Sequence, residues 1–253
     1  MKKLLAITAL SAALFFGQTA VAEEKAAEEV KPSHVEMVLV LDESGSMSDL
    51  TRDTIGGFNS MIEKEKKLDV DAHVTTVLFN DQYKMLYNRR ELKDVSKMTD
   101  KDYTPGGMTA LLDAVGRTIH KMDMVAGIHR KDKGNKVLFV IITDGEENDS
   151  KEYTYADVKK LIKDRQENAG WEFIFLGANI DAAAAAENLG IDRDRAVKYK
   201  NTGSGVRANF KAVAELSDSL AKSGRVSDRW KETVEKDEDD AADKQLSLIH
   251  ISE

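Results

Sequence analysis

The chain has 253 residues, of which 42% are hydrophobic, and this is enough for one globular domain with its own core. It contains no cysteine, which excludes disulfide bonds, zinc–thiolate sites and thiol catalysis. The formal net charge of −8 makes the chain a poor partner for nucleic acids and for anionic lipid surfaces.

Residues 1–22 have the features of a secretory signal peptide. Two lysines precede a short apolar stretch at 4–16, and alanines occupy positions −3 and −1 of a cleavage site after Ala22. The alternative, a membrane anchor, needs about 20 consecutive apolar residues, and this stretch is shorter. We therefore expect an exported protein, periplasmic or secreted, whose mature chain is not inserted in a membrane. Without the two lysines, that mature chain has a net charge of −10.

The composition divides the remaining chain into four parts. Residues 23–33 are charged and rich in alanine, which is typical of a flexible linker. Regular apolar patterns run through residues 34–224, which we expect to form one domain. Residues 225–245 include a run of charges and predict a solvated acidic tail, whereas residues 246–253 match no pattern here and are interpreted as non-native sequence.

Six segments of the domain predict strands. The first and fourth are almost continuously apolar, as expected of parallel strands covered by helices on both faces. The second and third are separated by only three residues, which permits an antiparallel hairpin and excludes a parallel crossover. The predicted strands are 35–41, 73–80, 84–88, 136–143, 171–177 and 196–200.

Helical periodicity fills the intervals between these strands. Apolar side chains recur at helical spacing within 55–62, 112–122 and 206–220, while 154–169 is helical by composition. Asp181 is a suitable N-cap for the alanine run that follows it. The alternation predicts an α/β fold with helices on a mostly parallel six-stranded sheet and one antiparallel edge strand.

Oxygen-bearing side chains follow the ends of two predicted strands and one glycine-containing loop. Asp42, Ser44 and Ser46 follow the first strand, and Asp144 follows the strand 136–143. Thr109 comes after a Pro-Gly-Gly segment and precedes a helix. In an open α/β sheet, ligands gather at the carboxyl ends of strands where the strand order reverses. If the two strands are neighbours at that point, their hard oxygen ligands predict a divalent-cation site.

These residues, in this order, resemble the metal-ion-dependent adhesion site (MIDAS) of the von Willebrand factor type A (vWA) family. The pattern is Asp-x-Ser-x-Ser after the first strand, a Gly-Gly-x-Thr loop, and Asp-Gly after a later apolar strand. The resemblance covers roughly residues 35–222 and implies a doubly wound six-stranded sheet, with helices on both faces.

The resemblance also implies roles for the five side chains. Ser44, Ser46 and Thr109 would contact Mg²⁺ or Mn²⁺, with Asp42 and Asp144 acting directly or through water. An Asp or Glu carboxylate of a partner protein would complete the coordination shell. The expected function is therefore non-enzymatic: an exported module for adhesion or scaffolding.

The alternative is a Mg²⁺-dependent phosphohydrolase on a similar α/β sheet. Enzymes of the haloacid dehalogenase type place an Asp-x-Asp pair after the first strand, and the first Asp attacks phosphorus. Here Ser44 occupies the second position, and no lysine is identified in the sequence as a ligand of the transferred phosphate. The sequence therefore favours the binding module.

Other polar residues carry a weaker signal. Glu43, Glu146 and Glu147 are expected to form a solvated acidic rim beside the cation site. The five histidines, at positions 34, 73, 120, 129 and 250, show no spacing typical of metal ligands.

Overall fold

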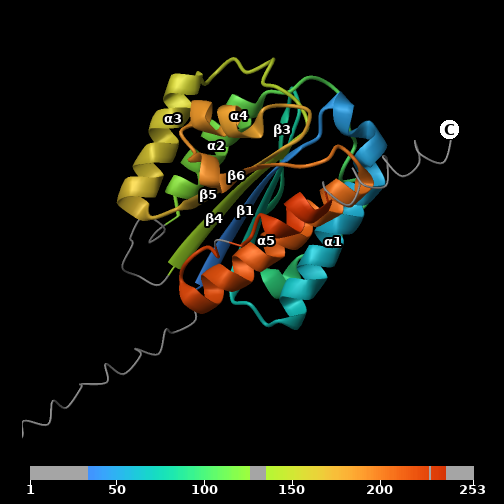
Figure 1. Ribbon diagram of the computed structural model, residues 1–253, viewed down its shortest axis with the longest axis vertical. Helices are drawn as coiled ribbons and strands as arrows, with labels where there is room; N and C mark the ends of the chain where they lie inside the picture. Colours follow the sequence, from blue (N-terminus) through green and yellow to red (C-terminus); the bar gives the residue numbers. More distant parts are fainter. Residues whose placement is uncertain (1–33, 126–134, 228, 238–253) are drawn as a thin grey trace, which may run out of the picture.

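The computed structural model describes residues 34–125, 135–227 and 229–237 (Figure 1). The predicted signal peptide, linker and non-native terminus lie outside these residues. Six strands form one sheet in the order β3-β2-β1-β4-β5-β6. The strands are β1 (His34–Asp42), β2 (Ala72–Phe79), β3 (Tyr83–Glu91), β4 (Asn135–Thr143), β5 (Glu172–Gly177) and β6 (Ala196–Lys198).

The strand order reverses between β1 and β4, which pair in parallel at the centre of the sheet. Leu41 of β1 lies opposite Ile142 of β4, so the two strands end at the same edge. β3 is antiparallel to β2, and every other neighbouring pair is parallel. The structure therefore confirms the predicted mostly parallel sheet with one antiparallel edge strand.

Helices cover both faces of the sheet (Figure 1). α1 and α5 lie together on one face, and α2, α3 and α4 lie on the other. No helix in the described part of the chain is long and apolar enough to cross a membrane. The helices are α1 (Thr51–Lys67), α2 (Leu111–Asp123), α3 (Tyr155–Asp164), α4 (Ala182–Leu189) and α5 (Gly203–Ser223).

The apolar runs of the central strands supply both layers of the core, because successive side chains of a strand point to opposite faces. On β1, Leu39 and Leu41 face the α1/α5 layer, whereas Val38 and Val40 face the other layer. β4 alternates in the same way. This two-sided burial explains why both strands are nearly continuous in apolar residues.

The packed chain continues beyond Gly224, where the sequence places the end of the domain. Val226, Trp230 and Val234 are all buried and belong to the core cluster on the α1/α5 face. Thr233 donates a hydrogen bond to Glu215 of α5 at 2.9 Å. Val226, Trp230 and Val234 lie in the segment that its charges assign to a solvated tail, but they contribute to the core, because three apolar side chains recur at four-residue spacing.

The contact between α1 and α5 contains polar groups as well as apolar ones. Glu65 of α1 is completely buried, and neither of its carboxylate oxygens has a hydrogen-bond partner among the described residues. The buried side chain of Asn209 on α5 likewise lacks a partner in the described part of the chain, and the hydroxyl of Ser217 lies near Glu65 and lowers its pKa in part. Burial raises the pKa of Glu65 to about 7, because the charged form is poorly solvated there.

We predict that Glu65→Gln stabilises the protein increasingly as pH rises from about 4.5 to about 7. The folded state holds a proton on Glu65 that the unfolded state releases, so the wild type loses stability over this interval. Above pH 7, the unfolding free energy of Glu65→Gln relative to the wild type should have risen by on the order of 3 kcal/mol over its value at low pH. Urea unfolding at several pH values measures it.

The control is Glu63→Gln, which changes an exposed residue on the same helix. Equal pH profiles for the two variants would show that the buried carboxyl does not oppose folding.

Candidate metal centre

All five predicted site residues lie at the edge of the sheet where β1 and β4 end. Asp42 is the last residue of β1, and Asp144 directly follows β4. Thr109 lies two residues before the start of α2. Ser44 and Ser46 lie in the link between β1 and α1, Ser46 within a short 3₁₀-helix, Gly45–Leu50. The strand reversal therefore brings together three segments that are far apart in sequence.

Asp42 is a buried carboxylate held from both sides. Its Oδ1 accepts a hydrogen bond from the Ser44 backbone N–H at 2.7 Å, and its Oδ2 accepts one from the Thr143 hydroxyl at 2.6 Å. Burial raises the pKa of Asp42, and the negative charge of Asp144 adds to this, while the hydrogen bonds oppose it. The Tyr103 hydroxyl donates to the Asp42 carbonyl at 2.6 Å. This carboxylate is consequently fixed in orientation.

A chain of contacts joins the two serines to Asp144. The hydroxyls of Ser44 and Ser46 are 3.2 Å apart, and Ser46 Oγ donates to Asp144 Oδ1 at 2.5 Å. The other oxygen of Asp144 lies 3.4 Å from the side-chain amide of Asn201. Ser44 and Asp144 are buried, whereas Ser46 is exposed. The group is therefore reached from solvent on the Ser46 side.

Thr109 is positioned by backbone hydrogen bonds to the neighbouring loops. Its N–H donates to Asn148 Oδ1 at 2.8 Å, and its carbonyl accepts from the Asn148 N–H at 3.0 Å. The preceding Gly107 has φ = 75°, and its carbonyl accepts from the Gly45 N–H at 3.2 Å. A side chain at Gly107 would collide with Asp81, so only glycine fits this left-handed position.

The donor set fits a hard divalent cation. A methyl group built on Gly145 would lie 3.8 Å from Thr109 Oγ1 and 3.9 Å from Ser46 Oγ, so both hydroxyls lie beside the same glycine. With Ser44 and the two carboxylates, the edge presents oxygen ligands of the kind that Mg²⁺ and Mn²⁺ prefer. The structure thus brings all five predicted residues together.

The acidic rim is only partly as predicted. Glu43 is buried, and it accepts hydrogen bonds from the backbone and hydroxyl of Thr104. Glu147 accepts from the Leu112 N–H at 3.0 Å, at the start of α2, and from Ser150. Glu146 alone of the three is exposed. Glu43 and Glu147 therefore hold loops in place, because they accept hydrogen bonds from backbone N–H groups that have no backbone acceptor at a helix start or in a buried loop.

Four residues around the centre were not identified from the sequence. Thr143, Tyr103 and Asn148 hold Asp42 or Thr109, and Asn201 lies beside Asp144. Thr143 carried a usable signal, since a polar residue at the end of an apolar strand directly precedes Asp144. The other three come from loops whose approach depends on the folded chain.

A family model for the vWA domain found at the TerF C terminus matches residues 34–191, which is more than half of the chain. The chain belongs to the von Willebrand factor type A family. No curated protein sequence matches it.

Solved structures similar to this vWA domain share its fold at low sequence identity. The pilus adhesin SpaC of Lactobacillus rhamnosus GG has a TM-score of 0.59 at 14% identity, over 77% of this chain and 31% of that chain. The vWF domain of the type V pili tip protein Mfa5 of Porphyromonas gingivalis has a TM-score of 0.53 at 12% identity, over 78% and 99%.

The PilB minor pilin of Streptococcus sanguinis has a TM-score of 0.52 at 13% identity, over 73% and 61%. This chain therefore spans less than two thirds of SpaC and of PilB.

We predict that Thr143→Val destabilises the vWA domain by about 1–3 kcal/mol at neutral pH, because it leaves a buried oxygen of Asp42 without its donor. Urea unfolding of both proteins measures the difference. Thr76→Val is the matched control, since Thr76 is also a buried strand residue but its hydroxyl has no partner among the described residues. Its effect should be neutral or stabilising. Equal effects of the two substitutions would show that the hydrogen bond from Thr143 to Asp42 does not stabilise the domain.

Proposed function

We propose that this vWA domain is an exported protein-binding module that binds a partner carboxylate through Mg²⁺ or Mn²⁺. The observation that carries the proposal is the convergence of Asp42, Ser44, Ser46, Thr109 and Asp144 at one edge of the sheet. In this proposal the edge is a metal-ion-dependent adhesion site, and an Asp or Glu of the partner protein completes the coordination shell.

The three hydroxyls would contact the cation, with the carboxylates acting directly or through water. Both oxygens of Asp42 already accept hydrogen bonds, which favours an indirect role for this residue. Neutral hydroxyl ligands leave most of the positive charge of the cation unneutralised, so an additional carboxylate from outside is attracted to it. The bound cation would thereby join two acidic surfaces.

The surface beside the centre supports a protein as the partner. Met108, next to Thr109, and Tyr155 are large hydrophobic side chains that are about half exposed, at 50% and 44%. A hollow of about 280 Å³ opens beside Gly145, with Tyr155 and Ile180 in its wall. Apolar groups around a charged anchor are typical of protein interfaces, because the apolar contacts exclude water from the charge.

The cellular setting of the proposal is the periplasm or the exterior of the cell. It is supported by the signal-peptide pattern of residues 1–22 and by the pilus proteins among the structural neighbours. The acidity of the chain favours a protein partner over nucleic acid.

We predict that Mg²⁺ or Mn²⁺ raises the unfolding temperature of the chain lacking residues 1–22. A ligand that binds only the folded state stabilises it by about 2.7 kcal/mol at 100 times its dissociation constant. Differential scanning calorimetry in Mg²⁺, Mn²⁺, Ca²⁺ and EDTA measures this. The stabilisation should disappear in Ser44→Ala/Thr109→Ala and persist in Ser48→Ala, an exposed serine of the 3₁₀-helix that follows Ser44. An equal metal response of the wild type and both variants would show that Ser44 and Thr109 do not bind the metal ion.

We predict no metal-dependent hydrolysis of p-nitrophenyl phosphate. Phosphohydrolases of the haloacid dehalogenase type use an Asp-x-Asp pair after the first strand, and here Ser44 replaces the second Asp. A colorimetric assay with Mg²⁺ compares the wild type with Asp42→Asn. Turnover that requires Mg²⁺ and is lost in Asp42→Asn would contradict the proposed binding function and support the phosphohydrolase alternative.

A further inference from the structure

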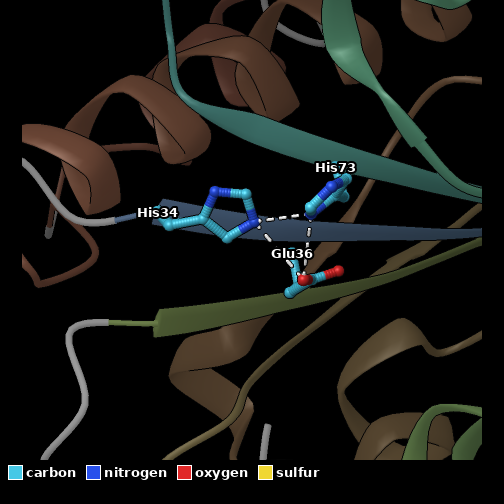
Figure 2. Close-up of side chains that lie close together, drawn as sticks. All are labelled: His34, Glu36 and His73. Atoms are coloured by element: carbon cyan, nitrogen blue, oxygen red, sulfur yellow. Dashed lines mark hydrogen bonds and ion pairs between the residues drawn. The ribbon is translucent and has the colours of Figure 1, made fainter. Parts of the chain in front are cut away.

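A second group of side chains of the types that bind metals, two histidines and a glutamate, lies at the opposite end of β1. His34 and Glu36 are two residues apart on this strand and therefore point to the same face. His73 of β2 is the register partner of Glu36 in the parallel pair. Figure 2 shows the three side chains turned toward one another above the neighbouring strands. Eight residue steps at ~3.3 Å separate His34 from Asp42, so the two ends are about 26 Å apart.

Three ligand atoms of this group form a nearly regular triangle (Figure 2). His34 Nε2 is 2.8 Å from His73 Nδ1, and Glu36 Oε1 is 3.3 Å and 3.2 Å from these two nitrogens. In a tetrahedral zinc site with bonds of about 2.0–2.1 Å, neighbouring ligand atoms are about 3.3 Å apart. The triangle would therefore accept a metal ion with small side-chain movements.

The second nitrogen of His34 orients its ring for this role. His34 Nδ1 lies 2.9 Å from Asp71 Oδ1, so an Nδ1–H proton is held by the carboxylate. In the neutral ring this leaves the lone pair on Nε2, the atom that points into the triangle. A carboxylate behind a histidine ligand is a common support of metal sites, because it selects the tautomer and makes the ligand more basic.

Glu36 supplies a permanently charged ligand. It is 2% exposed, and although burial opposes ionisation, hydrogen bonds from His34 and Arg89 lower the pKa of Glu36 to about 2. Arg89 Nε lies 3.0 Å from Glu36 Oε2, and its Nη2 contacts Oε1 and lies 3.2 Å from His73 Nδ1. The guanidinium therefore already neutralises the carboxylate and would have to withdraw partly when a metal ion binds.

Solvent reaches the group from one side. His34 and His73 line a surface hollow of about 460 Å³, together with the acidic residues Asp69, Asp71 and Glu91 and with Lys93. Lys93 pairs with Glu91, so Asp69 and Asp71 supply the negative charge that favours the approach of a cation. The hollow also leaves room for water or another ligand at the remaining coordination positions.

We propose that His34 Nε2, His73 Nδ1 and Glu36 Oε1 form a second metal site, selective for Zn²⁺ or a similar transition-metal ion. Two imidazoles favour such ions over Mg²⁺ and Ca²⁺, which prefer oxygen ligands. Arg89 is a competing internal cation, so removal of its charge strengthens metal binding. This site is independent of the oxygen-lined centre at the other end of β1.

The competing explanation is a proton-sharing network without metal. The hydrogen bond to Glu36 raises the pKa of His34, burial opposes this, and Asp71 adds to the rise. Protonated His34 would then donate to both Asp71 and the group around Glu36. In that case none of the side chains would show a specific affinity for Zn²⁺.

Isothermal titration calorimetry with Zn²⁺ at pH 7.5 separates the two explanations, with excess Mg²⁺ present to occupy the oxygen-lined centre. We expect one Zn²⁺ per chain, and at least tenfold weaker binding by His34→Gln and by His73→Gln. His120→Gln, which alters an exposed histidine outside the group, should bind as the wild type does. Arg89→Gln should bind more tightly. Absence of Zn²⁺ binding, or equal binding by all four variants, would overturn the site.

A supporting residue provides a test that does not touch the three ligands. Asp71 is 76% exposed, so Asp71→Asn is not expected to disturb folding. Loss of a carboxylate behind a histidine ligand typically weakens metal binding 10–100-fold. Unchanged Zn²⁺ affinity in this variant would contradict the assigned tautomer of His34. The visible spectrum of added Co²⁺, recorded for the same proteins, should show nitrogen coordination only where His34 and His73 are both present.

Discussion

The parallel pairing of β1 with β4 is the constraint on which the rest of the structure depends. Both strands are apolar on both faces, so they are stable only where helices cover the sheet on each side. Their common edge is the place where Asp42 and Asp144 meet, and the Thr143 hydroxyl joins the end of β4 to Asp42. The hydrophobic core and the oxygen-lined centre are therefore consequences of one strand pairing.

The centre is shaped by the protein's own hydrogen bonds. Asp42 is held by Ser44 and Thr143, while Thr109 is held by reciprocal backbone and side-chain bonds to Asn148. An arrangement fixed in advance loses little conformational freedom when a ligand binds, which improves affinity. The buried acids that cap loops, such as Glu43, contribute to this rigidity.

The sequence predicts the six strands and the antiparallel edge well, because apolar runs indicate the strands and a short link indicates the hairpin. The pairing of β1 with β4 is established only in the folded chain. The five site residues follow from their positions at the ends of strands and at the start of a helix. The histidine group could not be predicted, because His34 and His73 are 39 residues apart and meet only through the register of β1 with β2. The burial of Trp230 was also missed, because the surrounding charges obscure a short apolar repeat.

The burial of Trp230 has a consequence for spectroscopy. The chain has two tryptophans, and they lie on opposite faces of the sheet: Trp230 in the layer of α1 and α5, and Trp171 in the layer of α2, α3 and α4. Each is 2% exposed, so the emission of each indole should shift to longer wavelength only when its own layer opens to water. The intrinsic fluorescence of single-tryptophan variants thus distinguishes loosening of one layer from cooperative unfolding of both.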